Sequence, residues 1–230
     1  PDRFRAAMAA PVAARKTLFA LYAFNIEVSR APWVTQEDMI AEMRLQWWRD
    51  AVEEIGQGGV VRRHEVVDAM AAVLDADGAA CLDGLIAARR WDIYKDAFED
   101  QAHFDEYIDA TAGNLMWVTA RLLGPCEEPV VRDLAYAAGV ANLLRAIPAL
   151  EEQGRKPLVD GTPQGVRDLA QAALERLDMA QRGRRLISKA AAPALVAGWA
   201  AAPVLRQAAA SPARVIDGAL EPGPFRFANV

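Results

Sequence analysis

The stretch from Val130 to Leu144 constrains the fold most, because it is almost wholly apolar. Its only charged residues, Arg132 and Asp133, lie near its start. A helix that is apolar around its whole circumference must be covered by protein on every side. We therefore expect this stretch to form the middle helix of a helical bundle.

The rest of the chain is also patterned for helices. Alanine, the best helix former, supplies 48 of the 230 residues, and runs of alternating Val, Ile and Thr that would indicate strands are missing. Proline and glycine divide the chain into roughly eight helical stretches, which include 35–56, 61–74, 78–98, 104–123 and 163–187. No period of 20 to 50 residues repeats. The prediction is an all-α fold, with residues 1–230 forming a single domain.

Charge and composition exclude several classes of protein. The 31 acidic and 26 basic residues give a net charge of −5, so a nucleic-acid partner is not expected. Two cysteines and two histidines cannot build a zinc site or a disulfide framework. The longest uncharged run, 190–205, is short for a membrane span and is interrupted by prolines. Because the start of the chain lacks a secretory pattern, the expected location is the cytoplasm.

Four segments of the chain form a pattern: Leu18–Phe24, Arg44–Arg49 (RLQWWR), Tyr107–Gly124, and Asn142–Arg145 followed by Gln153–Arg155. Together they resemble the squalene/phytoene synthase family, whose members join two isoprenoid diphosphates in an all-helical fold. The resemblance covers residues 18–159 and implies a helical bundle of the isoprenoid synthase type.

In that family, two acidic clusters facing each other across a cavity hold Mg²⁺ ions, which bind the substrate diphosphate. The present chain departs from the pattern at both places. Ser29, Arg30 and Trp33 stand where the first acids align, and Ala146-Ile147-Pro148 stands where the second cluster begins. A site with isolated carboxylates retains little affinity for Mg²⁺. We therefore expect no catalytic residue, no metal site and no cofactor, with Mg²⁺ required only if the chain is an enzyme after all.

Three pairs of aspartates with four-residue spacing occur elsewhere in the chain. They are Asp92/Asp96, Asp96/Asp100 and Asp105/Asp109. They lie outside the places where the resemblance puts the metal clusters, so we interpret them as a solvated acidic face. A working synthase would have to use a rearranged set of acids such as Asp92, Asp96 and Asp100.

The candidate site residues are those expected to line the old cavity or to bind an anion: Tyr22, Asn25, Glu27, Arg44, Asn142 and Arg145. Arg145 ends the apolar helix, where a buried arginine needs an acceptor. The acceptor could be Glu27, an aspartate of the 78–98 stretch, or an anion such as a lipid head group. Arg44 and Arg49 either bind phosphate or pair with the nearby acids Glu42, Asp50 and Glu53.

The branch of the family that the chain is most similar to is related to mitochondrial complex I assembly factors, which keep the RLQWWR signature and lack the acidic clusters. This resemblance implies a catalytically silent protein that binds a protein partner, with respiratory complex I subunits as the expected partners and contact with the inner face of a membrane. Two alternatives stay open. One is an active prenyl transferase, and the other is a carrier that keeps the cavity for an isoprenoid, a quinone or another lipid.

Overall fold

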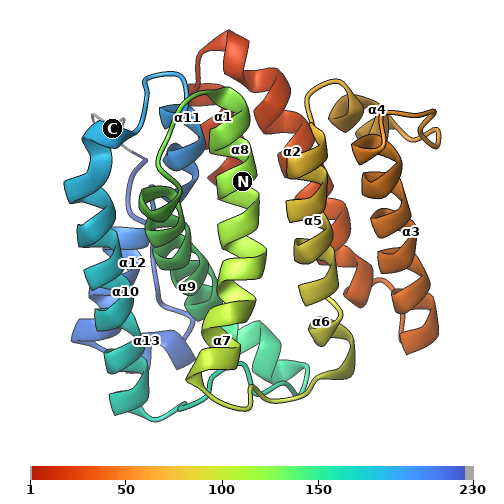
Figure 1. The fold of residues 1–230 in the computed structure, drawn as a ribbon. Coiled ribbons are helices and arrows are strands. Elements are labelled where there is room, and N and C mark those ends of the chain that lie inside the picture. The colour runs from red at the N-terminus through yellow and green to blue at the C-terminus, as the bar shows by residue number, and fades with distance from the viewer. Residues whose placement is uncertain (1, 226–230) are drawn as a thin grey trace.

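A computed structural model describes residues 2–225 of the chain, and Figure 1 shows them as an all-helical bundle. Within this range the only β-type pairing is an isolated bridge between Cys126 and Ile187. The α-helices are α1 (Asp2–Ala9), α2 (Val12–Arg30), α3 (Asp38–Gly56), α4 (Glu65–Ala71), α5 (Ala76–Ala88), α6 (Trp91–Tyr94), α7 (Gln101–Ile108), α8 (Asn114–Leu123), α9 (Glu128–Glu152), α10 (Pro163–Gly183), α11 (Ala192–Leu195), α12 (Ala201–Ala210) and α13 (Ala213–Ile216).

Helix α9 is the central element, as the apolar stretch 130–144 predicts. It packs against α7, α8, α10, α11, α12 and α13, and Figure 1 shows it behind α7 and α8, with α10 and α12 on one side. The run from Ala135 to Ala141 is buried throughout. The helix also continues through Pro148 to Glu152, further than the apolar pattern alone indicates.

Two apolar clusters make up most of the core. One joins α2, α3, α4 and α5, and the other joins α7, α9, α10 and α12. Helix α8 contributes to both, with Leu115 and Val118 in the first cluster and Met116 and Ala120 in the second. Alternate faces of this one helix therefore connect the two halves of the bundle.

The stretch predicted as one helix over 104–123 is helical from Gln101 to Leu123, but it contains a π-helical turn at Asp109–Gly113. Thr111 supports this turn, because its Oγ1 donates a hydrogen bond to the Tyr107 carbonyl at 2.6 Å. Gly139 of α9 lies against the turn, and a Cβ there would come within 2.8 Å of the Ala112 Cβ. Glycine thus allows α9 to approach the π turn closely.

One predicted helix and the uncharged run 190–205 are broken in the structure. The 78–98 stretch ends as α5 at Ala88 and restarts as the short α6, after which Lys95 adopts a left-handed conformation with φ 59°. The 190–205 run is divided into α11 and α12 by a 3-10 turn at Val196–Gly198. Among the described helices, none combines the length and the apolar character that a membrane crossing requires.

Candidate functional site

A cavity of about 360 Å³ lies between the two halves of the bundle. Helices α2 and α9, the α5–α6 junction and the π turn supply its walls. Its buried polar lining consists of Asn25, Asp92, Thr111 and Arg155. The exposed lining residues Asn142, Ala149 and Gln153 mark the side on which it opens to solvent.

One wall carries a closed set of three hydrogen-bonded side chains. Arg89 Nη1 donates to Asp92 Oδ2 at 3.0 Å and to Tyr107 Oη at 2.7 Å. Tyr107 Oη in turn donates to Asp92 Oδ1 at 3.0 Å. Burial by itself lowers the pKa of Arg89, but the contacts with Tyr107 and Asp92 together raise it. Burial raises the pKa of Tyr107. The wall therefore holds a guanidinium and a carboxylate that neutralise each other.

Arg155 enters the cavity because of how α9 ends. Gly154 adopts φ +78°, the Gly154 amide donates to the Glu151 carbonyl at 2.8 Å, and the Arg155 amide donates to the Leu150 carbonyl at 3.0 Å. This is a Schellman motif, in which glycine takes the left-handed position after the helix. The motif reverses the chain and directs the Arg155 side chain back toward the bundle.

No carboxylate of residues 2–225 forms an ion pair with Arg155, which is 6% exposed. Its guanidinium lies over the ring of Trp33 at 4.4 Å and near that of Trp91 at 5.9 Å. Its Nε and Nη1 atoms are buried without a hydrogen-bond partner in this part of the chain. Burial lowers the pKa of Arg155, with Asp92 and Tyr107 acting in the opposite direction.

Arg3 of α1 is the third guanidinium at the cavity. Its guanidinium carbon is 5.9 Å from the centre of the Tyr22 ring. Burial lowers the pKa of Arg3, and the positive charge of Arg89 acts in the same direction, against the opposing influence of Tyr22. Arg3 and Arg89 therefore both contribute positive charge to the cavity lining.

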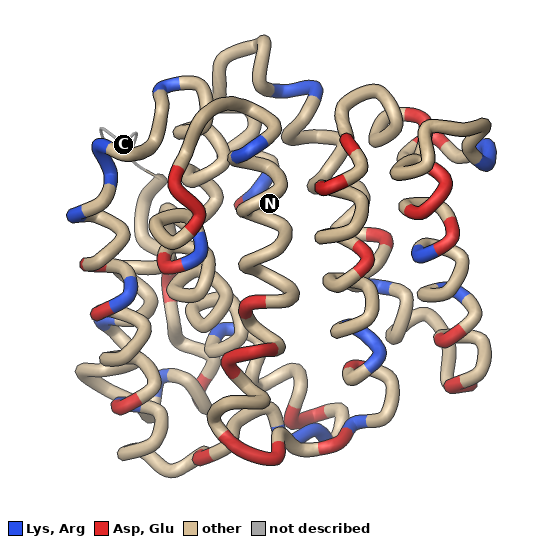
Figure 2. Tube along the Cα trace, viewed as in Figure 1, with Lys and Arg blue, Asp and Glu red and all other residues tan. Residues whose placement is uncertain are grey.

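The lining does not fit the Mg²⁺ ions that the family resemblance implies. Three arginines border the cavity, while Asp92 is the one acid among its described lining residues, and it is already bonded to Arg89 and Tyr107. Across residues 2–225, no group of three or more His, Cys, Asp or Glu side chains is arranged to hold a metal. The positive lining repels Mg²⁺. In addition, one carboxylate that is already bonded falls short of the several oxygen ligands that the ion requires. Figure 2 shows that acids and bases are otherwise interspersed along the helices, so this imbalance is local.

The six predicted site residues separate into three groups. Asn25 and Asn142 line the cavity as predicted. Tyr22 lies beside it, facing a void of about 20 Å³ that Arg3 and Asn142 also line. Its hydroxyl has no partner among the described atoms, and burial raises its pKa to about 12.

The other three residues do not line this cavity. Glu27 and Arg44 line a separate surface groove with Trp47 and Trp48. Arg145 pairs with Asp2 of α1 at 2.9 Å, an acceptor that the sequence argument did not consider. An acid 143 positions away along the chain is visible only after folding.

The predicted solvated acidic face is present only in part, since Asp96 and Asp100 are exposed. Asp92 is 5% exposed and bonded to Tyr107, so it is not part of a solvated face. Asp100 caps the start of α7 through the His103 amide, and Asp109 pairs with Arg132. Arg49 pairs with Asp83 of α5 at 2.6 Å instead of with its neighbours on α3.

The sequence argument missed Arg3, Arg89 and Asp92 as lining residues, and it quoted Arg155 only as part of a family segment. For Arg155 a local signal exists, since an arginine directly after a helix-ending glycine is turned back toward the helix it follows. For Arg3 no local signal exists, because its neighbours at the cavity come from other helices. For Arg89 the only local signal is its ion pair with Asp92, three residues later, which does not reveal the cavity.

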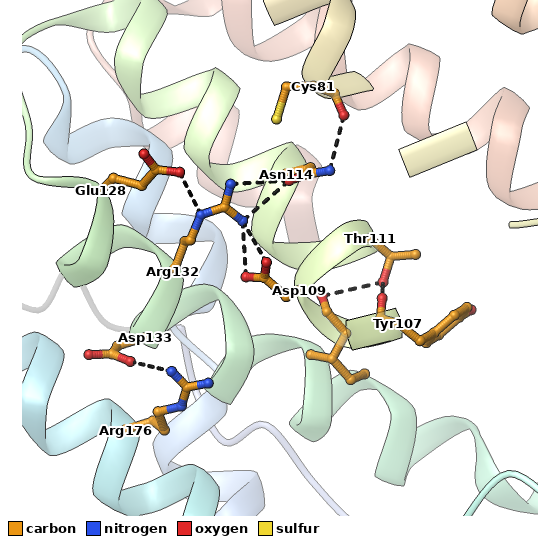
Figure 3. A network of polar contacts seen from close by, with 10 residues as sticks. Cys81, Tyr107, Asp109, Thr111, Asn114, Glu128, Arg132, Asp133 and Arg176 are labelled. Carbon is orange, nitrogen blue, oxygen red and sulfur yellow. Dashed lines mark hydrogen bonds and ion pairs between the residues drawn. The ribbon is translucent and has the colours of Figure 1, made fainter. Parts of the chain in front are cut away.

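A second polar network supports the π turn from outside the cavity, and Figure 3 shows it. Arg132 of α9 donates to Glu128 Oε1 at 2.7 Å, to both oxygens of Asp109 at 2.9 Å, and to Asn114 Oδ1 at 3.2 Å. Asn114 Nδ2 donates to the Cys81 carbonyl at 3.0 Å. The network thereby joins α5, the π turn, α8 and α9.

Comparison with known proteins identifies the family. A sequence model of squalene/phytoene synthases matches residues 1–158. This chain belongs to the squalene/phytoene synthase family. A solved dehydrosqualene synthase with a bound ligand superposes with a TM-score of 0.73 over 90% of this chain and 82% of that chain, at 17% identity. The predicted family and the predicted isoprenoid synthase fold are both confirmed.

Two curated relatives of this squalene/phytoene synthase family member carry a different description. The chain is 25% identical over 142 residues to human "NADH dehydrogenase (ubiquinone) complex I, assembly factor 6" and 30% identical over 149 residues to its Drosophila melanogaster homolog. Each match covers 60% of this chain, but only 43% and 44% of the two relatives. The chain therefore spans less than half the length of these proteins. Their similarity confirms the predicted branch of the family.

Proposed function

We propose that this chain is a catalytically silent family member that acts by binding, in the assembly of respiratory complex I. The observation that carries the proposal is the cavity lining, which combines three arginines with a single, already bonded acid. A synthase needs the opposite charge there, because metal ions must stabilise the departing diphosphate. The similarity to two proteins described as complex I assembly factors supports the choice of process.

The absence of synthase activity is tested by pyrophosphate release. The purified chain is incubated at high concentration with farnesyl diphosphate and Mg²⁺, beside an active family member as the positive control. We expect no release above that of a buffer blank, because loss of metal stabilisation forfeits about three powers of ten in rate for each 4 kcal/mol. Mg²⁺-dependent release would support the alternative of an active prenyl transferase.

The assembly role is tested by affinity capture of the tagged chain from its native cells. We expect subunits of respiratory complex I among the captured proteins. Leu45 is fully buried in the α2–α5 half, so a Leu45→Asp variant unfolds that half and serves as the control for capture by exposed apolar surface. Recovery of no respiratory-chain subunit, or equal recovery by the variant, would contradict the proposal. The predicted cytoplasmic location and membrane contact stay predictions that fractionation of the same cells can check.

A further inference from the structure

We infer that the surface groove between α2 and α3 docks an amphipathic helix of a partner protein, a helix that is apolar on one face and carries a carboxylate at the edge of that face. The inference rests on the proposed function, in which the chain acts by binding, and it names the surface used and the kind of segment bound. Among the described residues, the groove shares no lining residue with the central cavity.

An ordered aromatic floor is the first support. The groove has a volume of about 380 Å³, and Trp47 and Trp48 line it with ring centres 5.0 Å apart. The His64 ring lies 5.3 Å from each of them. Arg62 holds Trp47 in place, because its Nη1 donates to the Trp47 carbonyl at 2.9 Å and its guanidinium lies over the Trp47 ring at 4.9 Å. Arg62 is itself paired with Glu54 at 2.8 Å. A floor that is already ordered loses little conformational entropy when a partner binds.

An exposed apolar stripe on α3 continues from this floor. Met39 is 76% exposed and Met43 is 66% exposed, and with Trp47 they follow one another at four-residue spacing, which places them on one face of the helix. Val34, in the segment after α2, also lines the groove and is exposed. Exposed methionines adapt their shape to the surface of a partner.

The length of the stripe indicates a helix as the occupant. Eight residues separate Met39 from Trp47, and at a rise of 1.5 Å per residue they span about 12 Å, or roughly two turns. A second helix lying along the stripe presents a matching row of apolar side chains when these recur every three or four residues. An amphipathic segment with apolar residues at positions i, i+3 or i+4, and i+7 therefore fits the stripe.

The charges of the groove indicate that this helix carries an acid. Arg30 and Arg44 both line the groove, and neither takes part in any ion pair between residues 2–225. In contrast, Arg49 of the same helix α3 is paired with Asp83. With Glu27 as the acid of the lining and His64 neutral, two arginines and one glutamate give the groove a formal charge of +1. A carboxylate of the partner complements this charge and fixes the orientation of the docked helix.

Photo-crosslinking in the native cells tests the inference on the full chain. Met43→benzoylphenylalanine places the photoreactive group beside the groove, and Met179→benzoylphenylalanine, on an exposed position of α10, is the matched control. Figure 1 shows α10 and α3 at opposite edges of the bundle. We expect a protein crosslink from position 43 and none from position 179. Mass spectrometry of the crosslinked peptide should find apolar residues at the stated spacing and an Asp or Glu within one turn of them.

Charge variants made in the position 43 crosslinking protein test the role of the arginines. Arg44→Glu should lower the crosslink yield about 10-fold, because it replaces an attraction with a repulsion, and Arg206→Glu, on the exposed side of α12, should leave the yield unchanged. Glu27→Gln should raise the yield, since it removes the acid that competes with the partner's carboxylate. Circular dichroism verifies that each variant is folded.

Several results would overturn the inference. They are no crosslink from position 43, an equal crosslink from position 179, a crosslink to a lipid or to a second copy of this chain, a crosslinked segment without the amphipathic pattern, and a yield that Arg44→Glu leaves unchanged. The proposed function fails separately. A position 43 crosslink to an amphipathic segment of a protein outside the respiratory chain supports the groove and contradicts the complex I role. Capture of respiratory-chain subunits without a position 43 crosslink supports the role and contradicts the groove.

Discussion

Arg132 and Arg155 both belong to the α9 region, and they stand in opposite environments. Arg132 is surrounded by acceptors from Glu128, Asp109 and Asn114. Arg155 is more deeply buried, and its guanidinium lies near the rings of two tryptophans without an ion pair among residues 2–225. Burial of an arginine therefore does not by itself indicate what the residue does. Arg132 stabilises the fold through these bonds, whereas Arg155 keeps buried donors without a hydrogen-bond acceptor among residues 2–225.

The largest effect is expected from Arg132→Met. The variant loses a network that joins four elements, so the free energy of unfolding should fall by about 2 kcal/mol. Chemical denaturation measures this difference. The exposed, intrahelical pair of Arg182 and Asp178 provides the control, and Arg182→Met should change stability by less than about 0.5 kcal/mol. Equal effects of the two substitutions would contradict the structural role assigned to Arg132.

Gly154→Ala should produce the next largest effect. Its left-handed conformation is costly for a residue with a Cβ, so we expect a loss of about 1.5 kcal/mol in the free energy of unfolding. Gly161 is the matched control. Open space surrounds both glycines, but the φ of Gly161 is ordinary. A loss in Gly161→Ala as large as that in Gly154→Ala would show that the Schellman turn is not the cause.

Arg155→Met should act in the opposite direction from Arg132→Met. Because it replaces a buried charge that has no acidic partner with an apolar side chain, we expect the chain to gain about 1 kcal/mol of stability. In a chain of this length, that gain raises the melting temperature by about 2–4 °C. Thermal unfolding without any added anion measures the shift, with Arg206→Met as the reference. A lower melting temperature would mean that the tryptophan contacts already compensate the charge.

The smallest effect extends the comparison to tyrosines. The Tyr22 hydroxyl has no acceptor among the described atoms, whereas the Tyr136 hydroxyl donates to Asp105 at 2.6 Å. We expect Tyr22→Phe to change stability at pH 7 by about 0.5 kcal/mol or less, and Tyr136→Phe to lose about 1 kcal/mol. Similar losses in the two variants would contradict the assignment of partners.

Ionisation of Tyr22 makes the free energy of unfolding depend on pH. With a pKa of about 12, folded Tyr22 keeps a proton that the unfolded chain releases near pH 10. Its contribution to stability is therefore complete below pH 10 and is lost as the pH rises through about 12. Denaturation of Tyr22→Phe over this range should show a shallower decline than the unmodified chain. An equal decline of stability with pH in the two proteins would show that a group other than Tyr22 causes it.

Much of the fold could be predicted from the sequence, because helical patterning and packing of α9 depend on local composition. The apolar run 130–144 correctly indicates the central helix, and the 104–123 stretch is helical as predicted. The π turn within it was not predicted, since it depends on Thr111 and on the close approach of Gly139. The Thr111 hydrogen bond is local and competes with ordinary helix geometry, whereas the approach of Gly139 is a tertiary contact.

The site was predicted less well than the fold. Asn25 and Asn142 lie at the cavity, on the faces of α2 and α9 that meet there. Glu27, Arg44 and Arg145 lie elsewhere, and the sequence does not show which way each side chain turns once the helices pack. The comparisons confirm the family, while the partner stays a proposal.

By itself, the sequence determined the helical class, the central helix and the replacement of the family's acidic clusters, because each of these depends on which residues occur at which spacing. The tertiary structure alone decided the charge of the cavity. Arg3, Arg89 and Arg155 are far apart along the chain, and their charges act on one space only after α1, the α5–α6 junction and the turn after α9 have packed around it. Electrostatic interactions depend on distance in space, and separation along the sequence does not reveal that distance.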